Sequence, residues 1–193
     1  MTLRKIAALG HPVLWARAAP VAPPFDETVQ LLVDDMIATM RDAPGVGLAA
    51  PQVYESRRVI VVQPARAAAE PLVLINPTLE PVADEMVLGL EGCLSIPDWQ
   101  GLVPRHRRVR FRGLDRAGRA IGGEAEDFFA RVLQHEVDHL DGILYPMRLR
   151  DMRDLATSRE ASHLMARSNT YAPEHEHEHE HEHEHEHDED RRP

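Results

Sequence analysis

One segment constrains the fold of this 193-residue chain more than any other, the run of residues 126–140. Its apolar residues recur at the three- and four-residue spacing of one face of an amphipathic helix; they are Phe129, Val132, Leu133, Val137 and Leu140. Gly142 follows, where a glycine commonly ends a helix. The segment therefore predicts a helix over about 126–140 with one side buried in a core.

The same segment carries an HExxH pattern, made by His135, Glu136 and His139. Four residues are slightly more than one helical turn, so the two imidazoles project from one face and can share a metal ion. Glu136 lies beside the first of them, within reach of a water on that metal. The pattern also occurs by chance on surface helices, and a catalytic site needs a third protein ligand and an open fourth position.

The best candidate for the third ligand lies upstream of the helix. Zinc proteases place it downstream, but here the stretch to Leu149 holds Asp141 and neither His nor Glu. Cys93 is the single cysteine of the chain, so it cannot form an intramolecular disulfide. Taken alone it could equally be an inert buried thiol. Beside two well-placed histidines, it indicates a metal site.

The rest of the chain predicts a mixed fold. Residues 26–42 predict a helix with Asp26 as N-cap and Pro44 and Gly45 at its end. Strands are expected at 58–63, 72–76, 86–88, 107–113 and 120–125, the last two joined by a hairpin turn at 115–118. A third helix is expected at 151–166. The predicted class is α+β, with short antiparallel strands packed around a central helix that carries the HExxH motif and a C-terminal helix.

Charge and hydropathy narrow the classes of partner. The formal net charge is −10, of which −8 lies in residues 174–193, which leaves −2 for the first 173 residues. A nearly neutral domain gives no signal for nucleic acid or an anionic membrane. No run approaches the roughly 18 apolar residues of a membrane span. The first residues do not resemble a secretory signal, so we expect a cytoplasmic protein.

The C-terminal segment differs in kind from the rest. Residues 174–187 are seven consecutive Glu-His pairs. Such a sequence has no apolar residue to bury, so we expect a catalytic domain at 1–172 and a disordered tail at 173–193. The tail could be an engineered affinity tag, a native metal-binding segment or low-complexity filler. Its imidazoles should bind extra transition-metal ions.

Three blocks, in order, carry a family resemblance: GVGLAAPQ at 45–52, EGCLS at 91–95 and QHEVDHLDG at 134–142. Together they make the chain similar to the peptide deformylase family over residues 1 to about 170. The resemblance implies a metal-dependent hydrolase that removes the N-formyl group from the N-terminal methionine of newly made polypeptides and releases formate. Its implied partners are N-formylmethionyl nascent polypeptides and, transiently, the ribosome, in a bacterial-type cytoplasm.

The resemblance also implies roles for single residues. Cys93, His135 and His139 would bind one divalent metal ion, Fe²⁺ by family precedent, with Zn²⁺, Ni²⁺ and Co²⁺ as alternatives. Glu136 would act as general base and then general acid. The side-chain amide of Gln52 and the backbone N–H of Leu94 would stabilise the oxyanion.

The implied substrate-binding residues are Val46, Gly47, Phe128 and Val132. Gly47 would allow close approach of a peptide, while Phe128 and Val132 could equally be core residues. Two ion pairs are expected near the site, Arg131 with Glu91 and Asp138 with Arg105. Gln100 stands where many bacterial deformylases have an arginine, which leaves the peptide preference open.

Two other functions remain open from the sequence. One is a zincin-type metallopeptidase, which the upstream Cys93 disfavours. The other is a non-catalytic deformylase-like protein that binds or stores metal, using the tail. The presence of Glu136 and Gln52 favours an enzyme, because a protein that only binds metal needs neither.

Overall fold

The structure is a computed structural model that describes residues 1–63 and 70–168. Its helices are α1 (Glu27–Asp42), α2 (Asp127–Leu140) and α3 (Ala161–Ser168), with short 3-10 helices η1 (Pro12–Leu14), η2 (Ala50–Val53), η3 (Tyr145–Arg148) and η4 (Met152–Asp154). Its strands are β1 (Gly47–Ala49), β2 (Val59–Val62), β3 (Leu72–Pro81), β4 (Met86–Cys93), β5 (Ile96–His106), β6 (Arg108–Leu114), β7 (Ala120–Glu126) and β8 (Leu155–Thr157). The predicted tail lies outside the described residues.

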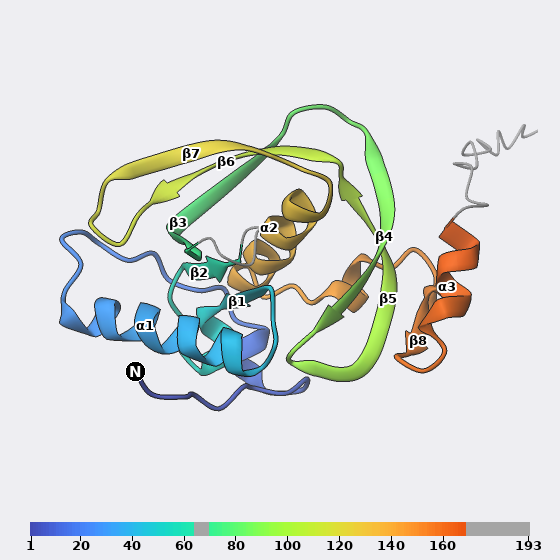
Figure 1. Cartoon of the computed structure of the whole chain (residues 1–193), viewed down its shortest axis with the longest axis horizontal. Coiled ribbons are helices and arrows are strands. Elements are labelled where there is room, and N and C mark those ends of the chain that lie inside the picture. The colour runs from blue at the N-terminus through green and yellow to red at the C-terminus, as the bar shows by residue number, and fades with distance from the viewer. Residues whose placement is uncertain (64–69, 169–193) are drawn as a thin grey trace, which may run out of the picture.

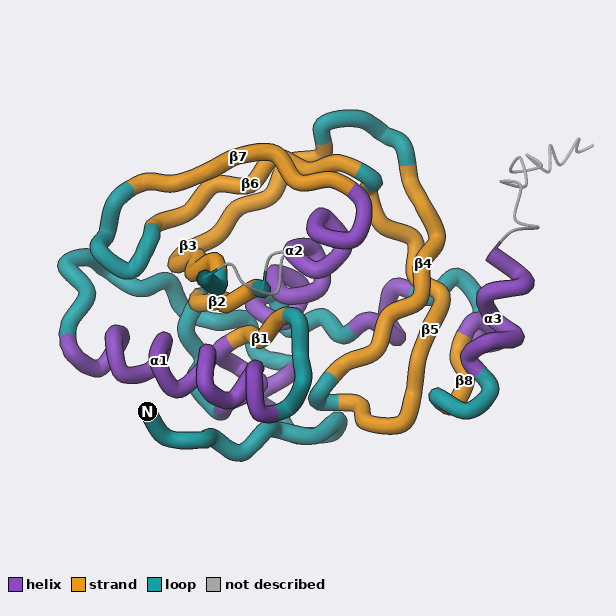
Figure 2. Tube along the Cα trace, viewed as in Figure 1, coloured by secondary structure: helices purple, strands orange, loops and turns teal. Residues whose placement is uncertain are grey.

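Two antiparallel sheets surround α2. One has the strand order β1-β2-β3-β6-β7 and the other the order β4-β5-β8. Figure 1 shows α2 at the centre, with α1 below the smaller strands β1 and β2, and with α3 beside β8 at the far end of the molecule. Figure 2 shows the same arrangement along the chain trace, with a long loop segment before α1. The predicted α+β class is confirmed.

The first helix follows its local sequence. Asp26 caps α1, because its side chain accepts a hydrogen bond from the Val29 N–H at 3.1 Å. The apolar face of α1 is buried against the first two strands of the larger sheet; it comprises Val29, Leu32, Val33, Met36 and Met40. The N-cap and the apolar spacing in the local sequence were therefore sufficient to predict this helix.

The second helix is buried on more than one side. Ala130, Leu133 and Leu140 pack in a core with residues of the larger sheet such as Ile60 and Leu74. A second set of α2 side chains is polar and also buried: Arg131, His135, Glu136, Asp138 and His139. Because buried polar groups are costly unless they are paired, this face of α2 must be occupied by specific partners.

Three sequence expectations need correction. The expected strand at 86–88 is the start of β4, which continues to Cys93. Residues 96–106, for which no strand was predicted, form β5, the partner of β4. The expected helix over 151–166 is wrong, since η4 and β8 precede a shorter α3. There Leu155 pairs with Gly101 of β5, and this pairing outweighs the helical pattern of the segment.

The predicted strands 58–63, 107–113 and 120–125 agree with β2, β6 and β7 within one residue at each end, whereas the predicted strand 72–76 covers only the first half of β3. In the predicted hairpin turn between β6 and β7, the Gly118 N–H donates to the Asp115 carbonyl at 2.9 Å. Within the described ranges, no helix has the length and apolar character that crossing a membrane requires.

Candidate metal centre

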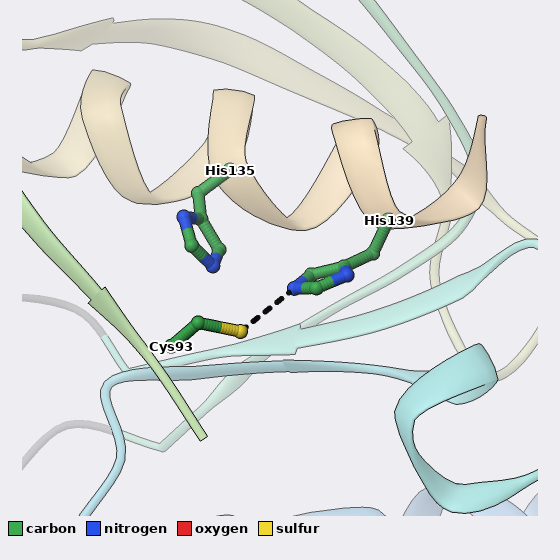
Figure 3. Close-up of side chains that lie close together, drawn as sticks. All are labelled: Cys93, His135 and His139. Carbon is green, nitrogen blue, oxygen red and sulfur yellow. Dashed lines mark hydrogen bonds between the residues drawn. The ribbon is translucent and has the colours of Figure 1, made fainter. Parts of the chain in front are cut away.

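The strongest cluster of potential metal ligands joins β4 to α2. Cys93 ends β4, and His135 and His139 lie one turn apart on α2. One ligand atom from each residue lies within 4.8 Å of the other two. The Cys93 Sγ is 3.3 Å from the His139 Nε2. Figure 3 shows the thiol pointing from the strand toward the two imidazoles on the helix.

This donor set fits a divalent transition metal. A thiolate and two imidazoles suit Fe²⁺, Co²⁺, Ni²⁺ or Zn²⁺, and three protein ligands leave room for a reacting group. The Nδ1 of His135 is taken by a carboxylate, so its Nε2 is the atom available to the centre. The buried Nδ1 of His139 has no hydrogen-bond partner among the residues that the structure describes.

The carboxylate behind His135 is Glu91 of β4. Its Oε2 lies 2.9 Å from the His135 Nδ1. Burial by itself would raise the pKa of Glu91, but hydrogen bonds from His135 and Arg105 and their charges outweigh burial and lower it to about 2. Glu91 is therefore an anion that fixes the ring orientation of a candidate ligand.

Both ion pairs expected from the sequence are confirmed. Arg131 donates to Glu91 at 2.8 Å, and Arg105 donates to Asp138. Arg131 also donates to the carbonyls of Val87 and Val103 at 2.8 and 2.7 Å. Its guanidinium therefore folds back into the β4–β5 hairpin.

Glu136 is buried beside the candidate metal ligands. The residue is 4% exposed, and its Oε2 has no hydrogen-bond partner among residues 1–63 and 70–168, which the structure describes. Burial raises its pKa to about 7, although the charges of His135 and Arg105 act in the opposite direction. A carboxylate with a pKa near neutrality can both accept and return a proton.

Gly47 makes room for this carboxylate. A Cβ built at Gly47 would overlap the Glu136 carboxylate and lie 2.8 Å from its Cδ. The glycine therefore leaves the space that the Glu136 side chain occupies where β1 approaches α2, whatever its role toward a substrate.

Gln52 is held in a defined orientation. Its Oε1 accepts from the Ala49 N–H at 2.9 Å, so its Nε2 points away from β1. That nitrogen donates to the Ser95 Oγ at 3.2 Å and to the Cys93 Sγ at 3.5 Å. The amide thus lies beside the thiol, with its N–H groups toward the centre.

A cavity of about 380 Å³ opens over the centre. It lies between β1, at one edge of the larger sheet, and β4, at one edge of the smaller sheet. Its lining includes every residue predicted for the site except His139: Val46, Gly47, Gln52, Cys93, Leu94, Phe128, Val132, His135 and Glu136. The cavity therefore collects predicted site residues that lie as far apart in the sequence as Val46 and Glu136.

Two of the lining residues were ambiguous between core and pocket. Phe128 is 57% exposed, so the core interpretation is wrong for its side chain. Val132 is 6% exposed, belongs to the core cluster and lines the cavity as well. Val46 is 45% exposed at the opposite rim.

Several cavity residues were missed. The outer part is lined by Asp98, Trp99 and Ser158, and the Ser158 N–H donates to the Asp98 carbonyl at 2.8 Å. Tyr145 is fully buried, and its ring is stacked on His135 with centroids 6.2 Å apart. No sequence spacing links these residues to the motif; only the β5–β8 pairing and η3 bring them there.

Comparisons with known proteins agree with this site. The family model for polypeptide deformylase matches residues 3–154. Peptide deformylase 1 of Bordetella pertussis is 46% identical over 157 residues, covering 78% of this chain and 89% of that protein. Peptide deformylase 2 of a Nostoc species is 40% identical over 173 residues, covering 86% and 97%.

Solved structures show the same fold. The actinonin-bound class I type b peptide deformylase of Acinetobacter baumannii superposes with a TM-score of 0.72 at 40% identity, over 77% of this chain and 99% of that one. The peptide deformylase of Thermotoga maritima gives a TM-score of 0.73 at 37% identity, over 78% and 100%. The chain belongs to the polypeptide deformylase family.

Proposed function

We propose that this protein is a metal-dependent hydrolase that removes the N-formyl group from the N-terminal methionine of newly made polypeptides and releases formate. The observation that carries the proposal is that three features lie together at one centre: a Cys-His-His donor set, a buried glutamate whose Oε2 has no hydrogen-bond partner among the described residues, and an oriented amide. Family membership supports this activity over that of a zincin-type peptidase.

The metal would be held by Cys93, His135 and His139. A divalent cation in such a site activates a water molecule and polarises a carbonyl oxygen. Fe²⁺ is our first choice by family precedent. Zn²⁺, Ni²⁺ and Co²⁺ are alternatives, because they also accept a mixed thiolate and imidazole set.

Glu136 would move the proton. It accepts a proton from the attacking water as the water oxygen bonds to the formyl carbon. It then gives that proton to the amine nitrogen as the C–N bond breaks, so that formate and a free N-terminus leave. Burial raises the pKa of Glu136 to about 7 in the metal-free protein, and a nearby cation would favour the charged form, which accepts the proton of the water.

Gln52 and Leu94 would stabilise the developing oxyanion. The Gln52 Nε2 lies within hydrogen-bond distance of Cys93 and Ser95, and in this position it would donate to an oxyanion that forms at the centre. The backbone N–H of Leu94 follows Cys93 in the turn between β4 and β5. A preorganised donor of this kind is typically worth about 10²–10³ in rate.

The substrate would enter as an extended chain between the two sheet edges. Val46 and Gly47 lie on the β1 side, and a peptide strand can pair with such an edge through its backbone. Phe128 and Val132 offer apolar surface for the methionine side chain. Gln100 also lines the cavity, at the position where many bacterial deformylases have an arginine. Its neutral amide would give this protein a peptide selectivity different from that of relatives with the arginine.

The proposal extends to partners and organisation. The substrates would be nascent polypeptides in the cytoplasm, met transiently at the ribosome. Residues 1–172 would form the catalytic domain. Residues 173–193 would act as a separate tail that binds extra transition-metal ions through its seven Glu-His pairs. A protein that only stores metal would need the tail but not Glu136 or Gln52.

The test is anaerobic purification, metal analysis and a formate-release assay on formyl-Met-Ala-Ser. We expect one active-site metal per chain and formate release that chelation abolishes and Fe²⁺ or Co²⁺ restores. Acetyl-Met-Ala-Ser is the matched substrate control and should not be hydrolysed. A fully metal-loaded protein that released no formate would refute the proposed function.

A further inference from the structure

A continuous series of ion pairs leads from His135 to the protein surface. Glu91 contacts His135, Arg105 joins Glu91 to Asp138, and Arg148 of η3 closes the series at its outer end. The series therefore connects a candidate metal ligand to a side chain well outside the cavity.

Each of the two carboxylates, Glu91 and Asp138, accepts two hydrogen bonds from a single arginine. Arg105 donates from Nε and Nη2 to the two oxygens of Glu91 at 2.9 and 3.0 Å, and its Nη1 reaches the Asp138 Oδ2. Arg148 donates from Nη2 to the Asp138 Oδ1 at 2.7 Å and from Nε to Oδ2 at 3.1 Å. Arginine provides this planar fork, and lysine does not.

Burial makes the members interdependent. The side chains of Glu91, Arg105 and Asp138 are 4%, 5% and 10% exposed, whereas that of Arg148 is 44% exposed. Charges in a poorly solvated interior interact strongly and are costly when a partner is lost. Without Arg148, Asp138 would depend on Arg105 alone. Asp138 would then compete with Glu91 for the Arg105 guanidinium, and Arg131 would remain as the second partner of Glu91.

That competition would reach the metal ligand. Glu91 is the group that holds the His135 Nδ1, and Asp138 lies three residues after His135 on the same helix. Arg131 would still hold the Glu91 Oε1, but a shift of Arg105 toward Asp138 would remove the arginine contact to Oε2, the oxygen that holds the imidazole, and so allow the ring to rotate. Partners of this kind around a ligand commonly change metal affinity by about 10- to 100-fold.

We infer that Arg148 is a positioning residue for the metal centre, acting through Asp138, Arg105 and Glu91 on the orientation of His135. The inference rests on the proposed metal site. It assigns to a half-exposed arginine, outside all three motif blocks, an effect on how firmly the metal is held.

The chain contains a matched control in Arg110. Its Nη2 lies 2.7 Å from the Glu124 Oε1, the same distance as the Arg148 Nη2 to Asp138, and it is 47% exposed. Glu124 is itself 50% exposed, however, and the pair lies on β6 and β7. Exposed pairs of this kind contribute little. Arg110 therefore resembles Arg148 in exposure and contact distance, but its partner Glu124 is an exposed strand residue, whereas Asp138 belongs to the series that leads to His135.

The experiment loads wild type, Arg148→Gln, Arg148→Lys and Arg110→Gln with Co²⁺. It records the thiolate-to-cobalt absorption and the rate of cobalt release to an excess of chelator. We expect Arg148→Gln to release cobalt about 3- to 10-fold faster, below the range for direct partners of a ligand, and to shift the cobalt bands. Arg148→Lys should lie between, and Arg110→Gln should match wild type.

Equal release rates and identical spectra for Arg148→Gln, Arg110→Gln and wild type would overturn the inference. If Arg148→Gln does not fold, Arg148→Lys decides, since it retains the charge but loses the two-point contact; wild-type behaviour would then overturn the inference. A wild-type protein without a thiolate-to-cobalt band would instead refute the metal site itself, and with it the proposed function.

Discussion

Replacement of Gly47 by alanine should separate metal binding from catalysis. The added methyl group would overlap the Glu136 carboxylate, with its carbon 2.8 Å from Cδ and 2.9 Å from Cγ. Carbon atoms that are not bonded rest about 3.5–4.0 Å apart. Glu136 must therefore retreat by roughly 1 Å, while Cys93, His135 and His139 lose no contact with Gly47.

The size of the effect follows from that displacement. A misplacement of about 1 Å in a reacting group can cost about 10²-fold in rate. This corresponds to ~2.7 kcal/mol of transition-state stabilisation. We expect kcat for formate release from formyl-Met-Ala-Ser to fall by about 10²-fold, with metal content and thermal unfolding temperature close to those of wild type.

Gly92→Ala is the matched control, because a Cβ there would meet the Gln100 Cγ at 3.6 Å and the Trp99 carbonyl oxygen at 3.8 Å, which are ordinary contact distances. Gly92 also lines the cavity, beside Cys93, so this variant controls for a methyl group added within the site, and we expect it to lose much less of the catalytic rate than Gly47→Ala. The reasoning would be refuted if Gly47→Ala, loaded with metal, turned over substrate as fast as Gly92→Ala.

Three further perturbations test separate parts of the site. Cys93→Ser should weaken metal binding, and Cys93 in the loaded wild type should resist alkylation until a chelator is added; rapid alkylation with retained activity would exclude the thiol as a ligand. In the metal-free protein, burial raises the pKa of Glu136 from 4.5 to about 7. The contribution of this carboxyl group to folding stability is therefore most favourable below the unfolded-state pKa of 4.5, and it is lost as the pH rises to the folded-state pKa of about 7. The free energy of unfolding of metal-free Glu136→Gln should therefore exceed that of metal-free wild type by ~3 kcal/mol at pH 8 and by much less at pH 5, as measured by urea unfolding. An equal difference at both pH values would contradict this. Truncation after Ala172 should leave kcat and KM of the loaded enzyme unchanged and reduce calorimetric binding of extra Ni²⁺; a large loss of activity would mean that the tail reaches the site.

The two long helices were predictable because their signals are local. Asp26, the apolar spacing of α1 and the HExxH spacing on α2 all lie within single segments. Helical periodicity places His135 and His139 on one face without reference to the rest of the chain. The same holds for the turn at Asp115, whose side chain accepts hydrogen bonds from the backbone of Ala117 and Arg119.

The β4–β5–β8 sheet was only partly predictable. Residues 96–106 contain Pro97, Gly101 and Pro104 and do not alternate between polar and apolar residues, so they lack the usual strand pattern. Their strand conformation depends on pairing with β4, including the direct pairing of Leu88 with Pro104. Because this pairing is tertiary, no short window of sequence contains it.

The contacts around the candidate metal centre were also only partly predictable from the sequence. The sequence indicated each of the pairs Arg131–Glu91 and Asp138–Arg105, but not that Arg105 joins them. The bridging role exists only because β5 places Arg105 between β4 and α2. The stacking of Tyr145 on His135 likewise depends on η3 returning to the helix.

The most direct measurement of the central claim uses Glu136→Gln, loaded anaerobically with Fe²⁺ or Co²⁺. Metal content and formate release from formyl-Met-Ala-Ser are measured on the same sample. We expect near-stoichiometric metal together with loss of nearly all formate release, because Glu136 is proposed to move protons without holding the metal. A variant that arrives without metal, or one that keeps wild-type turnover, would show that this role of Glu136 is wrong.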